Sequence, residues 1–304
     1  MRTAAVLALA CSSCGRLGFV DRDAAGVARG DGGGDAPLDA NLLGLTWTNI
    51  APVAALNLST SDEDDPTLTA DLLEIYFDSD RPGPGTGMGD IWMSSRASVT
   101  DAWSAPVLVA PLASPADDTT PEVAADGLSM YFASDRLNPG DRDIYVTTRA
   151  TRNDPWGAPT RVAELSSSLT DDSAEPLPDG LHLVMSRGAN MLLDLMVSTR
   201  STKTSPWGAP VPLPGLDDPM YDESQQWASP DLNVVYYVTD RPPAMSQDIW
   251  LATRPDSQSA FTSTLVTELQ SPVIDVDPWV SPDGHTLFFA SRRNGSVDIF
   301  TASR

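Results

Sequence analysis

The sequence predicts an all-β protein in which five four-stranded units close into a ring, and three observations support this prediction. A block of strand, turn and strand recurs five times, as in MYFASDRLNPGDRDIYVTTR, which begins at Met130. Equivalent positions recur at a nearly constant spacing. The last block stops before its final strand, and a strand of matching character precedes the first block.

Each block can be aligned on the Asp of the turn that joins its first two strands. These reference residues lie at intervals of 55, 53, 52 and 52 residues and are Asp71, Asp126, Asp179, Asp231 and Asp283. Gly follows the Asp in three of the five copies. Asp-Gly between apolar runs indicates a hairpin, because Gly tolerates positive φ. A period of about 50 residues with several strands per unit is typical of propeller blades.

The second and third strands of each block carry repeated charges. The second strand is an apolar run such as LSMYFAS, and in each copy it ends at an Arg: Arg81, Arg136, Arg187, Arg241 and Arg293. The third strand opens with Asp-Ile or Asp-Leu, and an Arg follows that Asp six residues later in all five copies: Arg96, Arg149, Arg200, Arg254 and Arg304. We expect the first set of arginines to pair with the Asp that opens the third strand, because the two meet across a hairpin.

A fourth strand follows in four blocks, as WSAPV at Trp103, WGAPT at Trp156, WGAPV at Trp207 and FTSTLV at Phe261. Pro within three of these segments indicates an edge strand, where a missing N–H costs little. The fifth block ends at Arg304 without this strand, and TWTNIAPVAAL, from Thr46, supplies it. The sequence therefore predicts a five-bladed β-propeller with four antiparallel strands per blade, closed by the N-terminal strand. A six-bladed ring is the alternative.

Two blocks carry a family resemblance. SPDGHTLFFASRRNGSVDIF and ADGLSMYFASDRLNPGDRDIY resemble the WD-like propeller repeat of the TolB C-terminal domain, and the resemblance covers about residues 46 to 304. It implies a propeller that is exported and acts as a binding scaffold. TolB-like propellers usually have six blades, and no counterpart of the N-terminal domain of TolB is recognisable. The partners of TolB are therefore not transferred to this chain.

The N-terminal segment predicts export. In residues 1–20 one Arg precedes an apolar stretch, which is the pattern of a signal peptide, and Cys11 after small residues resembles a lipoprotein signal. Cys14 is a second candidate for lipidation. Residues 21–41 are rich in Gly, Ala and Asp and are expected to form a flexible linker to a propeller domain at 42–304. We expect a periplasmic protein or an outer-membrane-anchored lipoprotein, with secretion as the alternative.

Composition excludes several functions. The net charge of −23 disfavours binding to nucleic acid and to anionic lipid. Cys11 and Cys14 are the only cysteines, so the propeller has neither disulfides nor a catalytic thiol. The two histidines, His182 and His285, lack the spacing of a zinc site. We expect a monomer without a long apolar membrane span.

Two sets of residues are candidates for binding. The position four residues before the reference Asp is expected to lie near the axis, and there the sequence has Thr67, Glu122, Glu175, Trp227 and Trp279. Trp227 and Trp279, with Glu122 and Glu175, are predicted to bind a ligand, with the indoles as a stacking platform for a sugar or peptide. Packing between blades is the competing interpretation of the tryptophans.

The position eight residues before the reference Asp is acidic in every block: Glu63, Asp118, Asp171, Glu223 and Asp275. Five carboxylates at one mouth of a channel would repel one another unless a cation or hydrogen bonds compensate them. Oxygen ligands suit Ca²⁺, so a calcium ion is the candidate cofactor. Capping of nearby backbone N–H groups is the alternative role.

From these patterns we expect a non-enzymatic scaffold whose channel mouth binds a protein, a peptide or a cell-envelope glycan. The repeated acids look alike, whereas glycoside hydrolysis requires carboxyl groups with different roles. No catalytic motif is present in the sequence. A glycoside hydrolase that uses carboxylates in the central funnel is the alternative function.

Overall fold

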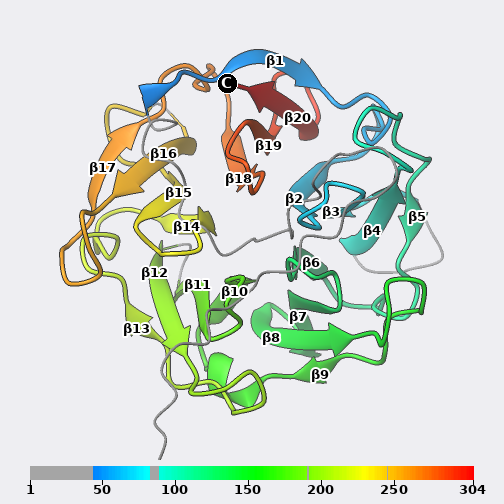
Figure 1. The fold of residues 1–304 in the computed structure, drawn as a ribbon, viewed down its shortest axis with the longest axis horizontal. Coiled ribbons are helices and arrows are strands. Elements are labelled where there is room, and N and C mark those ends of the chain that lie inside the picture. The colour runs from blue at the N-terminus through cyan, green and yellow to red at the C-terminus, as the bar shows by residue number, and fades with distance from the viewer. Residues whose placement is uncertain (1–43, 83–88, 190–191, 245) are drawn as a thin grey trace, which may run out of the picture. The chain divides into compact units, whose positions relative to one another are not determined.

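Five antiparallel sheets of four strands each form a ring in the described part of the chain (Figure 1). The computed structural model describes residues 44–82, 89–189, 192–244 and 246–304. Within these residues the five-bladed β-propeller is confirmed, and the six-bladed alternative is wrong. The predicted signal at 1–20 and linker at 21–41 lie outside the described residues. No helix among the described residues is long and apolar enough to cross a membrane.

Each blade is a meander of neighbouring strands, and the last blade takes its outer strand from the beginning of the propeller. By blade, from the inner to the outer strand, the strands are β2 (Glu63–Leu68), β3 (Glu74–Ser79), β4 (Asp90–Ser95) and β5 (Val107–Leu108); β6 (Asp118–Val123), β7 (Ser129–Asn138), β8 (Asp141–Thr148) and β9 (Thr160–Arg161); β10 (Thr170–Pro176), β11 (His182–Ala189), β12 (Leu192–Thr199) and β13 (Val211–Pro212); β14 (Glu223–Ala228), β15 (Val234–Thr239), β16 (Asp248–Thr253) and β17 (Thr262–Leu265); and β18 (Asp275–Val280), β19 (Thr286–Ser291), β20 (Asp298–Ser303) and β1 (Thr48–Pro52). A short 3₁₀ turn, η2 (Ala163–Leu165), follows β9.

The outer strands are shorter than the sequence indicated. In the first three blades the Trp of the WSAP or WGAP segment precedes the outer strand, which is only two residues long. Pro106, Pro159 and Pro210 stand between the Trp and the paired residues. Because Pro lacks an N–H to donate to the ladder, regular pairing begins only after it.

The arginine six residues after the Asp that opens the third strand stabilises the turn at the reference Asp. Its Nε donates to the carbonyl oxygen of the residue after the reference Asp, over 2.6 to 2.8 Å in all five blades. Its guanidinium also lies over an aromatic ring near the outer strand, 4.1 to 4.5 Å from the ring centroid. The constant offset of six residues is thus explained, because one side chain ties the turn, the third strand and the outer segment together.

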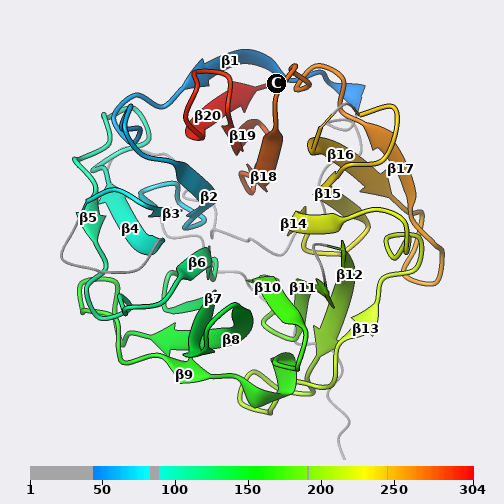
Figure 2. The same cartoon turned by 180° about the vertical axis from the view of Figure 1, so that it is seen from behind.

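The ring closes through the N-terminal strand, as the sequence predicted. Strand β1 pairs antiparallel with β20, with Pro52 opposite Phe300 (Figures 1 and 2). Trp47 stacks on the guanidinium of Arg304 at 4.1 Å and meets the edge of Tyr236 from the neighbouring blade at 6.3 Å. Arg304 Nη1 also donates to the Tyr236 hydroxyl over 3.0 Å. The closing contacts therefore join β1, the end of β20 and the fourth blade.

The innermost strands β2, β6, β10, β14 and β18 surround the centre of the ring (Figures 1 and 2). Each contains a bulge after the residue that follows the repeated acid. The next residue has a left-handed conformation, with φ between 47° and 53°, and is Asp65, Thr120, Ser173, Gln225 or Asp277. None of these is Gly, so each position carries backbone strain. Bulges re-aim the side chains that follow them, and here those side chains line the channel.

Candidate functional site

A cup of about 640 Å³ opens where the innermost strands approach the reference turns. Its wall repeats in every blade and consists of small or apolar residues: Leu68, Val123, Pro176, Ala228 and Val280 three positions before the reference Asp, and Ala70, Ala125, Pro178, Pro230 and Pro282 one position before it.

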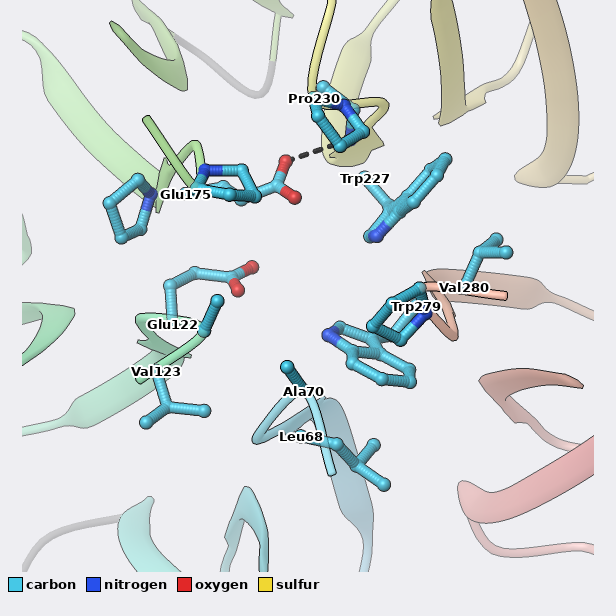
Figure 3. A pocket seen from close by; sticks show the side chains of 14 residues that line it. Leu68, Ala70, Glu122, Val123, Glu175, Trp227, Pro230, Trp279 and Val280 are labelled. Carbon is cyan, nitrogen blue, oxygen red and sulfur yellow. Dashed lines mark hydrogen bonds between the residues drawn. The ribbon is translucent and has the colours of Figure 1, made fainter. Parts of the chain in front are cut away.

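The polar and aromatic lining of the cup breaks the five-fold repeat. Glu122 from β6 and Glu175 from β10 lie on one side, and Trp227 from β14 and Trp279 from β18 lie on the other (Figure 3). The first blade has Thr67 at the equivalent position. The structure thus brings together all four residues that the sequence singled out for ligand binding. Their unlike chemistry on a repeated apolar wall distinguishes this cup from a purely structural channel.

The two glutamates behave as an interacting pair in an apolar environment. Burial raises the pKa of Glu122 to about 8, while a hydrogen bond from Thr67 opposes the shift. Burial also raises the pKa of Glu175 well above its ordinary value, and the charge of Glu122 raises it further. Glu175 is held in place because its Oε2 accepts a hydrogen bond from the Ala228 N–H over 2.9 Å. Both carboxyl groups therefore favour the protonated form at neutral pH, and when Glu122 ionises near pH 8 its charge helps Glu175 to keep its proton.

Each of the two tryptophans packs against an aromatic side chain of the next strand. Trp227 contacts Tyr236 with a centroid separation of 6.1 Å, and Trp279 meets the edge of Phe288 at 6.2 Å. Only 7% and 8% of their surfaces are exposed. Most of each indole therefore packs within its blade and the remainder lines the cup, so a role in ligand binding stays a prediction.

The five repeated acids occupy a different place from the one expected. They form an ion pair within each blade, with the Arg that ends the second strand: Glu63–Arg81, Asp118–Arg136, Asp171–Arg187, Glu223–Arg241 and Asp275–Arg293. All five acidic side chains have 0% exposure. In the described residues, the one group of three or more acidic residues close enough to share a metal ion contains none of them.

These pairs also correct the expected partner of the arginines. The sequence predicted the Asp that opens the third strand, whereas the structure pairs Arg81 with Glu63 over 2.8 Å. The acid at the start of the innermost strand has no access to water, and the guanidinium compensates its buried charge. In the fourth blade burial raises the pKa of Glu223 to about 7, although the hydrogen bond and charge of Arg241 oppose the shift.

A second acidic group, whose members are sequence neighbours of the repeated acids, lies further along the innermost strands. Asp64, Asp65 and Asp277 each place a carboxylate oxygen within 4.8 Å of the others. Burial raises the pKa of Asp65 to about 7, and the charge of Asp64 contributes. A signal was present in the sequence, because Asp65 and Asp277 share a register position at which the other blades carry neutral residues.

Comparison of the fold with solved structures finds both binding proteins and enzymes. TolB from Acinetobacter baumannii is 16% identical, with a TM-score of 0.53 over 82% of this chain and 56% of that chain. An endo-arabinase from Bacteroides thetaiotaomicron VPI-5482 is 11% identical, with a TM-score of 0.59 over 86% of this chain and 98% of that one. An α-L-arabinofuranosidase from Podospora anserina, in complex with cellotriose, is 11% identical, with a TM-score of 0.58 over 85% and 96%. This chain spans little more than half the length of the Acinetobacter TolB.

No protein-family model and no curated protein matches the sequence. The expectation of a non-enzymatic protein is corrected by the structural neighbours, because several of them are glycoside hydrolases with the same fold. That expectation relied on the likeness of the repeated acids, which the structure assigns to ion pairs within the blades. The resemblance to the TolB repeat is confirmed for the fold: the chain is a TolB-like β-propeller with five blades.

Proposed function

We propose that this protein is a glycoside hydrolase whose active site is the cup between Glu122, Glu175, Trp227 and Trp279. One observation supports the proposal above the others: two interacting glutamates face two tryptophans across one cavity (Figure 3). These four residues occupy one repeat position in neighbouring blades, so their differences are not required by the architecture.

The chemistry of glycoside hydrolysis matches this arrangement. The reaction requires a carboxyl group that protonates the leaving oxygen and a carboxylate that acts as base or nucleophile. Mutual repulsion and burial keep a proton on the pair Glu122 and Glu175, so one member serves as acid when the other is ionised. The indole faces of Trp227 and Trp279 provide apolar surface for the C–H face of a sugar ring.

The neighbours support the substrate class. The endo-arabinase and the arabinofuranosidase have the same fold over most of their length. Arabinose-containing glycans are therefore the first substrates to test. Polymeric glycans lie outside the cell, and the predicted export signal at residues 1–20 fits a substrate of that kind.

The test is turnover by the full chain on 4-nitrophenyl glycosides, beginning with the α-L-arabinofuranoside, together with reducing-sugar release from arabinan. We expect hydrolysis of at least one member of the panel. Binding of a glycan by calorimetry without any hydrolysis would reject the hydrolase and leave the cup as a carbohydrate-recognition site. If the protein showed no glycan binding and no hydrolysis, both functions would be rejected.

The tryptophans give a second prediction. We expect Trp227→Phe and Trp279→Phe each to weaken glycan binding by about fivefold, because a smaller ring loses about 1 kcal/mol of stacking. The measurement is KM on the best substrate, or Kd by calorimetry. Trp92→Phe is the matched control, because Trp92 is equally buried at 8% exposure and does not line the cup. Equal weakening in the control would show that the effect comes from blade packing.

A further inference from the structure

A small cavity continues the channel beyond the cup. It has a volume of about 280 Å³ and shares Glu122, Trp227 and Trp279 with the lining of the cup. Its own lining comes from the bulged positions of the innermost strands and the residues after them, including Asp65, Gln225, Gln226 and Asp277. Glu122 therefore lines both cavities, whereas these four residues lie outside the lining of the cup.

The carboxylates in this layer are close enough to share one ion. One oxygen from each of Asp64, Asp65 and Asp277 lies within 4.8 Å of the other two. Calcium–oxygen bonds are about 2.3 to 2.6 Å long, so two ligands of one ion lie at most about 5 Å apart. Asp277 is 6% exposed, and neither of its carboxylate oxygens accepts a hydrogen bond from an N–H or a hydroxyl group of the described residues.

Neutral oxygens in the same cavity provide an independent indication of a ligand. Gln226 is 2% exposed, and its Nε2 donates to the carbonyl oxygens of Ser173 and Val184 over 2.5 and 3.4 Å. Its Oε1 is buried without a hydrogen-bond partner among the described residues, and so is the Oε1 of Gln225. Buried amide oxygens are costly when unpaired, and a cation would satisfy both.

We propose that the channel binds a calcium ion between Asp64, Asp65 and Asp277, with the side-chain oxygens of Gln225 and Gln226 as further ligands. Calcium accepts six to eight oxygen ligands in irregular geometry, whereas magnesium demands a near-ideal octahedron and retains its waters. Carboxylate and amide oxygens are its usual protein ligands. The ion would link the first, fourth and fifth blades, and it replaces the five repeated acids as the place for the predicted calcium.

The test uses the full chain after removal of metals with a chelator. We expect calorimetry to show one calcium site per chain. The melting temperature should rise by about 5 °C at a calcium concentration 100-fold above Kd, because the ion binds only the folded state. Magnesium should shift it less. These readouts do not depend on hydrolysis, so the calcium site and the hydrolase can fail separately.

The variants Asp65→Asn and Asp277→Asn should lose the calcium response. Each should melt at or above the metal-free parent, because a neutral amide relieves the repulsion among the carboxylates. Loss of the response is then not a sign of misfolding. Glu164→Gln, an exposed site with the same change of charge, is the control and should respond like the parent. An unchanged melting temperature in the parent, or an equal calcium shift in Asp277→Asn, overturns the proposal.

Discussion

Glu122→Gln and Glu175→Gln should each lower kcat on the best glycoside by about 100- to 10,000-fold while leaving the fold intact, because each removes one half of the acid–base pair. Gln preserves the size and polarity of the side chain and cannot exchange a proton. Glu175→Gln also retains an oxygen that can accept the hydrogen bond from Ala228. The measurement is kcat and KM for both variants, with the circular dichroism spectrum as the check on folding.

Glu164→Gln, an exposed Glu outside the cup, is the matched control and should keep full activity. If Glu122→Gln and Glu175→Gln retained more than half of the parent kcat, hydrolysis would take place elsewhere and the proposed active site would be wrong. If only one of them were inactive, the other glutamate would be a binding residue.

The pH dependence follows from the same pair. Because the pKa of Glu122 is about 8 in the folded protein and the charge of Glu122 raises the pKa of Glu175 further, activity should rise as pH increases towards 8, where Glu122 ionises while Glu175 keeps its proton. Stability changes in the opposite direction: Glu122 ionises near its ordinary pKa of 4.5 when unfolded, so its contribution to the free energy of unfolding falls as pH rises from 4.5 towards 8. Urea unfolding of Glu122→Gln should show a weaker loss over this range.

Trp47→Ala should lower the free energy of unfolding by about 3 to 5 kcal/mol, the usual cost of removing a buried Trp. Trp47 is 3% exposed and stacks on Arg304, so its removal also weakens the contact that holds β1 on β20. We therefore expect residues 44–56 to become sensitive to limited proteolysis. Chemical denaturation and mass spectrometry of the fragments measure the two effects.

Trp156→Ala is the matched control for ring closure. Trp156 is 6% exposed, lies 4.4 Å from the Arg149 guanidinium and meets the edge of Tyr76 at 5.9 Å, so it copies the environment of Trp47 inside a continuous blade. It should lose similar stability without releasing any terminal strand. Equal resistance of residues 44–56 to proteolysis in both variants would show that Trp47 does not hold the ring closed.

The architecture could be predicted because it is repeated. The Asp turn and the Arg six residues into the third strand each appear five times, at four intervals of 52 to 55 residues, so a chance match is excluded. Local contacts explain the repeated Asp and Arg. The residue after the Asp has a left-handed conformation that makes the turn, and the Arg donates a hydrogen bond to the carbonyl oxygen of that residue. The fifth block lacks its outer strand and an extra strand precedes the first block. Comparison with the other blocks therefore also predicted that the N-terminal strand closes the ring.

Pairings between charges could not be read from the repeat. Arg81 has acidic residues on either side of it in the sequence, and strand spacing alone places Asp90 as near as Glu63. Only packing shows that the guanidinium of Arg81 reaches Glu63, which is sealed from water. The same burial removes the five repeated acids from the channel, where the sequence had placed a cation.

By itself, the sequence determined the five-bladed ring, its closure and the four unlike residues at one register position. The tertiary structure alone decided that Glu122 and Glu175 share one cup with Trp227 and Trp279, and that Asp65 and Asp277 meet in the layer next to it. The physical reason is that a repeat specifies each blade through local contacts. A site at the axis depends on residues about 50 or more positions apart, which only the closed ring brings within reach of one ligand.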